Sequence, residues 1–333
     1  MVGLIADIGG TNARFALANE AGYYDVQVLQ CDDYPTIVEA ARAYLEKVAP
    51  EEMPTVGSFA IAGPVTGDWF EVTNNHWKFS VEETRKELGL QSLHLMNDFK
   101  AIALAVPHIG EEHLKTVAEG AVQDKAPIAI LGPGTGLGVA SLVWGEGRYI
   151  PVPGEGGHIT MPAKTQREFD LFRTLRYKYH HISAERVCSG KGLVNLYQAI
   201  VRLDGHDDLP ERTAAEISQA AINKECPVCE EALDKMCKFL GSAAGNHALM
   251  IGALGGVYIA GGIPEKLGEY FFQSSFYEEF LSKGRFREYL QPIPIKLITH
   301  PFTAMVGLHA DLFPPQESLK PELGNAATFE PQR

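Results

Sequence analysis

The sequence lacks an apolar run long enough to form a membrane-spanning helix. Cationic residues are also scarce, since 29 Lys and Arg stand against 42 Asp and Glu, and the formal net charge is -13. This balance argues against nucleic acid or an anionic membrane as a partner, so an anionic ligand needs local amides, a few cations and a metal ion. No charged leader with a cleavage site precedes the first apolar segment, and we therefore expect a cytoplasmic protein.

Cysteine is also rare, because the chain has only five in 333 residues. They are too few and too scattered for a disulfide scaffold. Cys226-Pro-Val-Cys229 has the spacing of zinc ligands, but only Cys237 lies nearby and a Glu-rich helical sequence follows. We interpret this motif as the start of a helix rather than as a metal site.

The length and composition suit a globular protein of two domains with a cleft between them. The hydrophobic content of 45% and the charged content of 21% are ordinary for such proteins. The fold therefore has to be predicted from the pattern of residues.

The first apolar segment, residues 4–17, predicts a β-hairpin with a chemically distinctive turn. Gly9 and Gly10 allow a positive φ and a close approach to a ligand, so that successive N–H groups can converge on an anion. Thr11 adds a hydroxyl donor. Asp7 would repel a bare phosphate, so its natural partner is a Mg²⁺ ion carried by that phosphate. An ordinary hairpin with a solvated aspartate is the alternative.

The same strand, glycine turn and strand recur at residues 127–143, where Gly134, Thr135 and Gly136 form the turn. The glycines fall at every second position and a strand pattern follows, which differs from the dinucleotide-binding fingerprint that opens a helix. A Walker A motif is also missing from the sequence. Two phosphate-binding hairpins, one in each half, fit this pattern best. A third strand leads into Gly261 and Gly262.

Polar side chains occur where predicted strands and turns end. A strand from Ser92 runs into a helix through Asn97 and Asp98, and ligands bind at such strand ends in open α/β sheets. Glu155 and His158 lie three apart in a glycine-rich, non-helical segment, and Glu185 lies at the start of another helix or in its cap. The structural alternatives are a capping role for Asp98 and Glu185 and a buried structural role for His158.

The remaining pattern alternates strands with helices, which indicates an α/β protein. Further strands are expected at 56–62, 69–72, 257–260 and 293–298, and helices at 34–48, 81–88, 168–179, 192–201, 213–223, 227–253 and 304–312. Residues 107–125 are polar and suit a connection between domains. The proline-containing tail, 314–333, is expected to be disordered.

These motifs occur in the order in which they occur in the bacterial glucokinases, and residues 2–313 resemble that family. The resemblance implies a two-domain actin-like, ribonuclease H-like ATPase fold whose interdomain cleft holds ATP and Mg²⁺. A small α/β domain would comprise residues 1–108 with 301–313, and a large α/β domain residues 109–300. The family often forms homodimers, and its activity belongs to glycolysis.

The resemblance also implies a role for each residue at a matching position. The first hairpin and the Gly134 to Gly136 hairpin would hold the ATP phosphates, with Asp7 contacting Mg²⁺ through water, and Gly261 and Gly262 would lie against the adenosine. Asp98 would be the general base that accepts the proton of the 6-hydroxyl of glucose. The sugar-binding residues would be Asn97, Asp98, Glu155, His158 and Glu185.

Two departures separate the chain from the related family of repressors and sugar kinases. Residues 159–169 contain no cysteine, so the zinc motif of that family is missing, and the sequence begins in the catalytic fold rather than in a DNA-binding domain. Two alternatives to a glucokinase stay open. One is a kinase for another hexose or an amino sugar, and the other is a sugar-binding regulatory protein that ATP closes without phosphoryl transfer.

Overall fold

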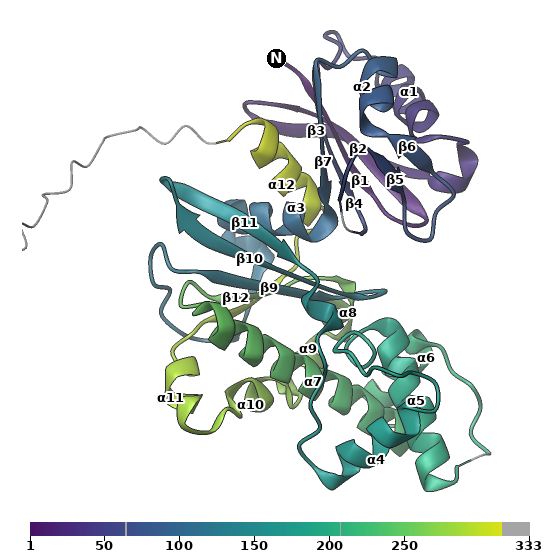
Figure 1. Cartoon of the computed structure of the whole chain (residues 1–333), viewed down its shortest axis with the longest axis vertical. Helices are drawn as coiled ribbons and strands as arrows, with labels where there is room; N and C mark the ends of the chain where they lie inside the picture. The colour runs from purple at the N-terminus through teal and green to yellow at the C-terminus, as the bar shows by residue number, and fades with distance from the viewer. Residues whose placement is uncertain (64, 207, 315–333) are drawn as a thin grey trace, which may run out of the picture.

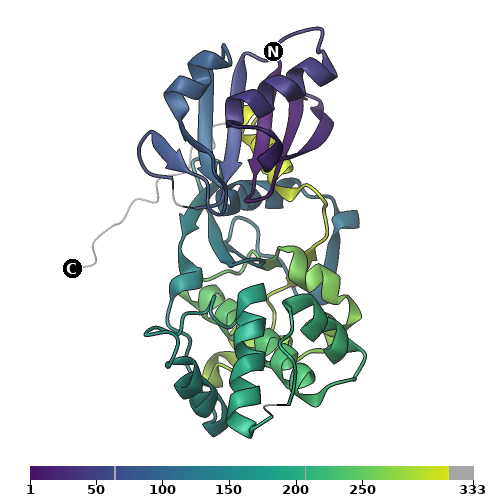
Figure 2. The same ribbon diagram turned by 90° about the vertical axis from the view of Figure 1, so that its right-hand side faces the viewer.

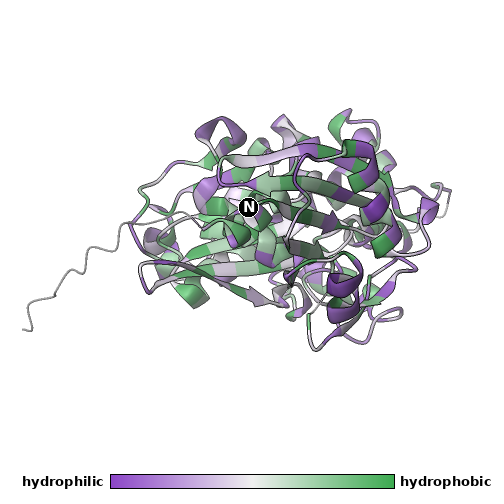
Figure 3. Cartoon of the chain, turned by 90° about the horizontal axis from the view of Figure 1, so that it is seen from above, coloured by the Kyte–Doolittle hydropathy of each residue, from purple (hydrophilic) through white to green (hydrophobic). Residues whose placement is uncertain are grey.

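The computed structural model describes residues 1–63, 65–206 and 208–314, and it contains two mixed β-sheets that lie one above the other (Figure 1). In the view turned by 90°, one sheet with its helices again lies above the other (Figure 2). The outer helices carry both hydrophobic and hydrophilic residues, as expected for helices with one buried face (Figure 3).

The first sheet has the strand order β3-β2-β1-β4-β7. β1 is antiparallel to β2 and parallel to β4, β2 is antiparallel to β3, and β4 is parallel to β7. The five strands are β1 (Gly3–Ile8), β2 (Asn12–Asn19), β3 (Gly22–Gln30), β4 (Val56–Ile61) and β7 (Ser92–Asn97). The hairpin predicted at residues 4–17 is confirmed.

The second sheet repeats this arrangement, with the order β11-β10-β9-β12-β13 and β8 added at the edge. Its strands are β8 (Leu114–Ala118), β9 (Ile128–Pro133), β10 (Leu137–Gly145), β11 (Arg148–Gly154), β12 (Val257–Ile259) and β13 (Ile295–Ile298). β9 and β10 form the second predicted hairpin, and β12 and β13 run parallel beside β9. The recurrence of the hairpin in the sequence therefore reflects two sheets with one topology.

Alternate residues of each central strand face opposite layers of helices, because the side-chain period of a strand is two. In β1, Leu4 and Ile8 pack with α1 (Ile37–Val48), whereas Ile5 packs with α12 (Thr303–Leu312). In β9, Leu131 faces the cluster that contains α7 (Pro227–Ile251), whereas Ile130 faces α3 (Asp98–Ala105). Both sheets are consequently covered on two faces.

Helices α3 and α12 lie between the two sheets and cross from one to the other (Figure 1). α3 follows the last strand of the first sheet but contacts β10 and β11, while α12 follows β13 but contacts β1 and β4. The two helices pack closely, since a Cβ on Gly307 would lie 1.8 Å from the carbonyl oxygen of Ala101. Gly307 is therefore the point at which the helix backbones meet.

The other elements lie around these two layers. The helices not yet given are α2 (Val81–Glu87), α4 (Gln166–Leu175), α5 (Gly190–Asp204), α6 (Ala214–Ile222), α8 (Gly262–Leu267), α9 (Glu269–Gln273), α10 (Phe276–Leu281) and α11 (Arg287–Leu290). The remaining strands, β5 (Trp69–Glu71) and β6 (Lys78–Ser80), form a separate pair. Single 3-10 turns occur at Cys31–Asp33, Val106–His108, Glu111–His113, Gly156–His158 and Gly284–Phe286.

Some sequence predictions were wrong in their boundaries or missed an element. Residues 107–125 contain β8 and are not only a connection, and β3, β6 and β11 were not predicted. α1 begins at Ile37 rather than at residue 34, because the Thr36 side chain accepts the Glu39 N–H and caps the helix. The helix expected at 168–179 spans Gln166–Leu175, with a capping box between Thr165 and Glu168.

The sequence also predicted that membrane-spanning helices are missing and that the C-terminal tail is disordered. Within residues 1–63, 65–206 and 208–314, no helix is both long enough and apolar enough to cross a membrane. The prediction of a disordered tail concerns residues 314–333, of which 315–333 lie outside the described residues.

Candidate active site

The first hairpin forms a tight turn that a backbone hydrogen bond closes. The Gly9 N–H donates to the Asn12 carbonyl at 2.9 Å, and the Asn75 side chain donates to the Gly9 carbonyl at 3.2 Å. The expectation of a positive φ is wrong, because neither Gly9 nor Gly10 has one. Gly10 is required for another reason: a Cβ there would lie 3.0 Å from the Asn74 carbonyl oxygen. The turn next to Thr11 is therefore packed against residues 73–75.

Asp7 lies opposite Arg14 in the register of β1 and β2. The Arg14 Nη1 donates to the Asp7 Oδ2 at 3.1 Å. Burial raises the pKa of Asp7, and the positive charge of Arg14 acts in the opposite direction. The carboxylate that the sequence suggests for Mg²⁺ is thus partly buried and held by a cationic neighbour.

The second hairpin is fixed from both sides by other segments. The Gly134 N–H donates to the Gly136 carbonyl at 2.8 Å, and the Gly190 N–H donates to the Gly134 carbonyl at 2.9 Å. Thr135 lies at the tip, between these two glycines. A Cβ on Gly136 would lie 2.4 Å from the Glu185 Oε2, so a side chain at this position would displace the Glu185 carboxylate.

Glu185 is the carboxylate that holds the second hairpin. Its Oε2 accepts the Leu137 N–H at 3.1 Å, and its own N–H donates to the Gly157 carbonyl at 2.8 Å. Glu185 therefore joins the hairpin to the segment that carries Glu155 and His158. It lies before α5 but does not cap it, because Ser189 is the N-cap residue of that helix.

Gly261 and Gly262 continue from β12 into α8. Gly261 has a φ of 85°, and a Cβ there would lie 2.5 Å from the Pro133 carbonyl oxygen. Both the conformation and the close approach require glycine at this position. Gly262 is the first residue of α8, so this turn lies beside the end of β9 that begins the second hairpin.

Asn97 and Asp98 lie where β7 ends and α3 begins. Asn97 is the N-cap residue, since its Oδ1 accepts the N–H groups of Phe99 at 2.8 Å and Lys100 at 3.2 Å. Its Nδ2 donates to the Gly63 carbonyl at 3.0 Å. Asp98 is the first residue of α3, so the alternative that Asp98 is the N-cap is wrong.

The surroundings of Asp98 raise the pKa of its carboxyl group toward neutral pH. Burial raises its pKa from 3.8 to about 6, and the negative charges of Asp7 and Glu155 also raise it. A hydrogen bond from the Phe99 N–H to the Asp98 Oδ1 at 2.9 Å acts in the opposite direction. The carboxylates of β1 and of the segment after β11 therefore act on the one at the start of α3.

Glu155 and His158 are exposed on a short turn. The exposed fractions of their side chains are 63% and 60%, and the Glu155 Oε2 lies 4.0 Å from the His158 Nε2. Gly157 between them has no room for a side chain, because a Cβ would lie 2.1 Å from the Leu137 carbonyl oxygen. The polar groups thus face solvent while the backbone of the turn packs against the second hairpin.

Phe99 and Arg14 are two site residues that the sequence analysis missed. Phe99 packs against the second hairpin, since a Cβ on Gly138 would lie 2.0 Å from its ring and one on Gly132 would lie 2.5 Å from it. No sequence pattern relates Phe99 to these distant glycines. The pairing of Arg14 with Asp7 could have been found by writing out the register of the predicted hairpin.

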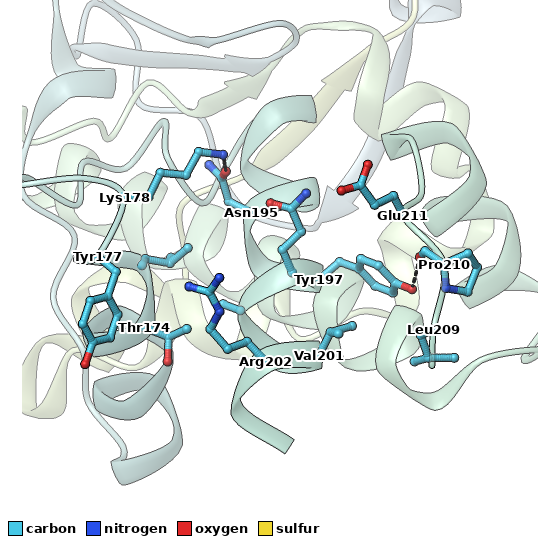
Figure 4. Close-up of a pocket in the computed structure, with 13 residues that line it drawn as sticks. Thr174, Tyr177, Lys178, Asn195, Tyr197, Val201, Arg202, Leu209, Pro210 and Glu211 are labelled. Carbon is cyan, nitrogen blue, oxygen red and sulfur yellow. Dashed lines mark hydrogen bonds between the residues drawn. The ribbon is translucent and has the colours of Figure 1, made fainter. Parts of the chain in front are cut away.

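A cavity of about 540 Å³ lies away from these residues, between α4, α5 and residues 209–211 (Figure 4). Lys178, Arg202 and Glu211 are among its lining residues. None of the residues that the sequence analysis assigned to the site lines this cavity. The candidate site is therefore defined by the hairpins and the carboxylates, not by this cavity.

Comparison with known proteins identifies the class of this fold. The crystal structure of a glucokinase from an Antarctic psychrotroph has a TM-score of 0.84 and 36% identity, and the alignment covers 93% of this chain and 98% of that chain. A ROK family glucokinase from Streptomyces griseus, in complex with glucose and AMPPNP, has a TM-score of 0.62, 19% identity and coverage of 94% and 99%. The fold is that of the sugar kinases with an actin-like ATPase architecture.

The sequence comparisons identify the family within this class. The glucokinase family model matches residues 4–313. A glucokinase from Paramagnetospirillum magneticum is 48% identical over 307 residues, which cover 92% of this chain and 95% of the relative. The chain belongs to the glucokinase family, and it is an enzyme that phosphorylates glucose.

Proposed function

We propose that the chain transfers the γ-phosphoryl group of ATP to the 6-hydroxyl of glucose, with Asp98 as the general base. The observation that carries this assignment is the environment of Asp98, a carboxyl group at the end of β7 whose pKa burial raises to about 6. A base with such a pKa is deprotonated at neutral pH and can still accept a proton efficiently. Asp98 would orient the hydroxyl and take its proton as the bond to phosphorus forms.

The sugar would be held by Asn97, Glu155, His158 and Glu185, in addition to Asp98. A neutral polyol needs a fixed set of acceptors and donors, and carboxylates, an amide and an imidazole provide both. Glu155 and His158 support this role because their polar groups are exposed. The Glu185 Oε2 accepts the Leu137 N–H, so its other oxygen would accept from the sugar while the first holds the hairpin.

The phosphates of ATP would lie against the two hairpin turns, Gly9 to Thr11 and Gly134 to Gly136, and the adenosine against Gly261 and Gly262. Glycine at these turns allows a ligand to approach the backbone amides closely. The Streptomyces griseus relative, which shares the fold, was crystallised with glucose and AMPPNP, and this supports ATP as the phosphoryl donor.

Asp7 is the residue that would hold Mg²⁺, through water. Its carboxylate fits the ion because it is partly buried and Arg14 is its one cationic partner among the described residues. When bound, Mg²⁺ would neutralise negative charge on the phosphates. The protein's own contribution is to orient the Asp7 carboxylate through the Arg14 hydrogen bond.

We also propose the organisation in which this reaction takes place. Residues 1–108 with 301–313 would form the small domain and 109–300 the large domain, which the contacts of α12 with β1 and β4 support. Binding of the sugar would bring the domains together and exclude water from the phosphates. The enzyme would act in the cytoplasm, in glycolysis, as a homodimer and without a nucleic-acid partner.

The test is ADP release from ATP and Mg²⁺ by the purified chain with glucose, mannose, fructose or N-acetylglucosamine. We expect turnover selective for glucose, and we expect Asp98→Ala to lower kcat by about 10²-fold to 10⁴-fold with a small change in the KM for glucose. Asp32→Ala, on an exposed turn, is the control and should keep full activity.

The outcomes separate the alternatives. Turnover with N-acetylglucosamine or mannose but not with glucose would show a kinase for another sugar. Sugar-independent ATP hydrolysis, unchanged in Asp98→Ala, would contradict phosphoryl transfer and support a sugar-binding regulatory protein. Size-exclusion chromatography with light scattering tests the homodimer.

A further inference from the structure

The Cys226-Pro-Val-Cys229 motif has no part in the proposed reaction. Cys226 is the N-cap residue of α7, Pro227 is the first helical residue and Cys229 is the third. The side chains of Cys226 and Cys229 lie within hydrogen-bond contact of each other, so the two thiols are close enough to react with one another. The motif therefore places two thiols side by side at the start of the longest helix described.

The two thiols differ in accessibility. Cys226 is 6% exposed, whereas Cys229 is 0% exposed. Burial and the neighbouring Cys226 together raise the pKa of Cys229 to about 12. Both thiols are buried, and the small exposed fraction of Cys226 is the side from which a reagent in solvent can reach the pair, whereas Cys229 can react only with its neighbour.

Arg212 gives this pair a cationic neighbour. Its positive charge acts on both Cys226 and Cys229, and it also faces Tyr197, whose hydroxyl donates to the Pro210 carbonyl at 2.8 Å. Among the side-chain atoms of the described residues, the Arg212 Nε is the one buried donor without a hydrogen-bond partner. A buried donor normally has an acceptor, and a thiolate at this place would be one.

We propose that Cys226 and Cys229 are a reversible dithiol–disulfide pair, a modification site that reacts with small-molecule disulfides such as oxidised glutathione. The Cys226 thiolate attacks one sulfur of oxidised glutathione, forms a mixed disulfide and releases one glutathione thiolate. The Cys229 thiol loses its proton and attacks the Cys226 sulfur, which releases the second glutathione. Two electrons pass from the two cysteines to the small disulfide, and the two cysteine protons end on the two released glutathione molecules.

The other cysteines serve as internal controls. Cys31, Cys188 and Cys237 are all 0% exposed. Burial raises the pKa of Cys188 and of Cys237, which are close enough to influence each other. A buried thiol with a raised pKa and no exposed partner is inert toward reagents in solution, so these residues should stay reduced.

The first experiment is mass spectrometry of the native chain after incubation with oxidised glutathione, followed by unfolding and alkylation of the remaining thiols. We expect an internal Cys226–Cys229 disulfide, seen as a loss of two hydrogens, with Cys31, Cys188 and Cys237 alkylated. Reduction with dithiothreitol should restore two free thiols. Full alkylation of Cys226 and Cys229 after long incubation would overturn the proposal, and this readout needs no variant and no kinase assay.

Two single variants test the order of attack. Cys229→Ser should trap glutathione on Cys226, because the resolving thiol is missing. Cys226→Ser should leave Cys229 unmodified, because Cys229 is buried. Glutathione on Cys229 of the native Cys226→Ser variant, with circular dichroism confirming its fold, would contradict the assigned roles.

The role of Arg212 is tested in the Cys229→Ser background by the rate at which iodoacetamide labels Cys226. Arg212→Gln should slow labelling at neutral pH by about tenfold, because it removes the cation that would stabilise the thiolate. Arg212→Lys keeps the charge and should retain most of the rate. An equal rate in the Gln variant, with the native circular dichroism spectrum, would contradict stabilisation of the thiolate by Arg212.

Discussion

At the scale of single residues, the site depends on what surrounds one carboxyl group. The sequence predicted that Asn97 and Asp98 lie at a strand end, but it left open whether Asp98 is the cap of the helix. Either side chain can cap, and the choice depends on the backbone of one residue. Because Asn97 caps α3, Asp98 is displaced into the first turn, where burial and two other carboxylates raise its pKa to about 6.

This raised pKa predicts a pH dependence of the reaction. The base has to be deprotonated, so kcat/KM for glucose should rise about tenfold per pH unit below about pH 6 and level off above it. The measurement is kcat/KM between about pH 5 and 8. A profile that stays flat through this range, while circular dichroism shows a folded protein, would contradict Asp98 as the base.

The same pKa predicts that Asp98→Asn stabilises the protein. The folded-state pKa lies above the ordinary value of 3.8, so the folded chain binds the proton more tightly and loses stability as the pH rises from about 4 to about 6. The amide removes this penalty, and the free energy of unfolding at neutral pH should rise by about 1–3 kcal/mol. Urea unfolding at about pH 7.5 and about pH 4 measures it.

The difference between Asp98→Asn and the unchanged chain should shrink at about pH 4, because the carboxyl group is then neutral in the folded chain and about half protonated in the unfolded chain. A variant that is equally or less stable at neutral pH would argue that Asp98 is not desolvated. Loss of activity together with a gain in stability is the pattern of a group kept for chemistry rather than for folding.

At the scale of elements, α3 connects the base to the second hairpin. Asp98 and Phe99 are consecutive residues of α3, and the Phe99 ring occupies the space that Gly132 and Gly138 leave open on β9 and β10. A displacement of the ring would move the carboxylate relative to the Gly134 to Gly136 turn. Small displacements of a reacting group lower the rate strongly.

Gly138→Ala should therefore lower kcat by about tenfold to a hundredfold, because its methyl group displaces the Phe99 ring. Gly145→Ala on the same strand is the matched control, since its Cβ would meet only the end of the Ile150 side chain at 3.1 Å. The double variant Phe99→Ala, Gly138→Ala should be less impaired than the sum of the two single effects. Additive effects would show that ring and glycine do not act together.

The elements also show where prediction from sequence succeeds. Both hairpins and the helix after Asp98 were predicted because their apolar patterns and turn residues are strong. β3 and β11 were missed because edge strands are half exposed and lack a clean alternation, and β8 was missed because its pairing with β13 depends on a distant segment. The close contacts of Glu185 with the second hairpin belong to the same class of distant pairings.

At the scale of the whole molecule, the two sheets share one topology and exchange their last helices. α3 leaves the first sheet to pack on the second, and α12 leaves the second to pack on the first. Each sheet consequently depends on a helix from the other half of the fold for one of its faces. Gly307 is where these two exchanged helices meet.

Gly307→Ala should destabilise the protein by about 2–4 kcal/mol, because the added methyl group would collide with the backbone of α3 at Ala101. In a helix without such a contact, the same change would stabilise by about 1 kcal/mol. The sign of the change in the free energy of unfolding, measured with urea, therefore shows whether α3 and α12 pack this closely. A gain in stability would contradict the close packing of α3 and α12.

The exchange of helices has a consequence for how the chain is made on the ribosome. β1 and β2 are complete once 19 residues have been synthesised, but Ile5 and Ala16 pack against Met305 and Leu308, which are among the last residues of the fold to be added. At about 5–20 residues per second, this apolar face of the nascent chain stays without its native cover for roughly 15–60 seconds. That interval is the time in which a ribosome-bound chaperone would have to shield it.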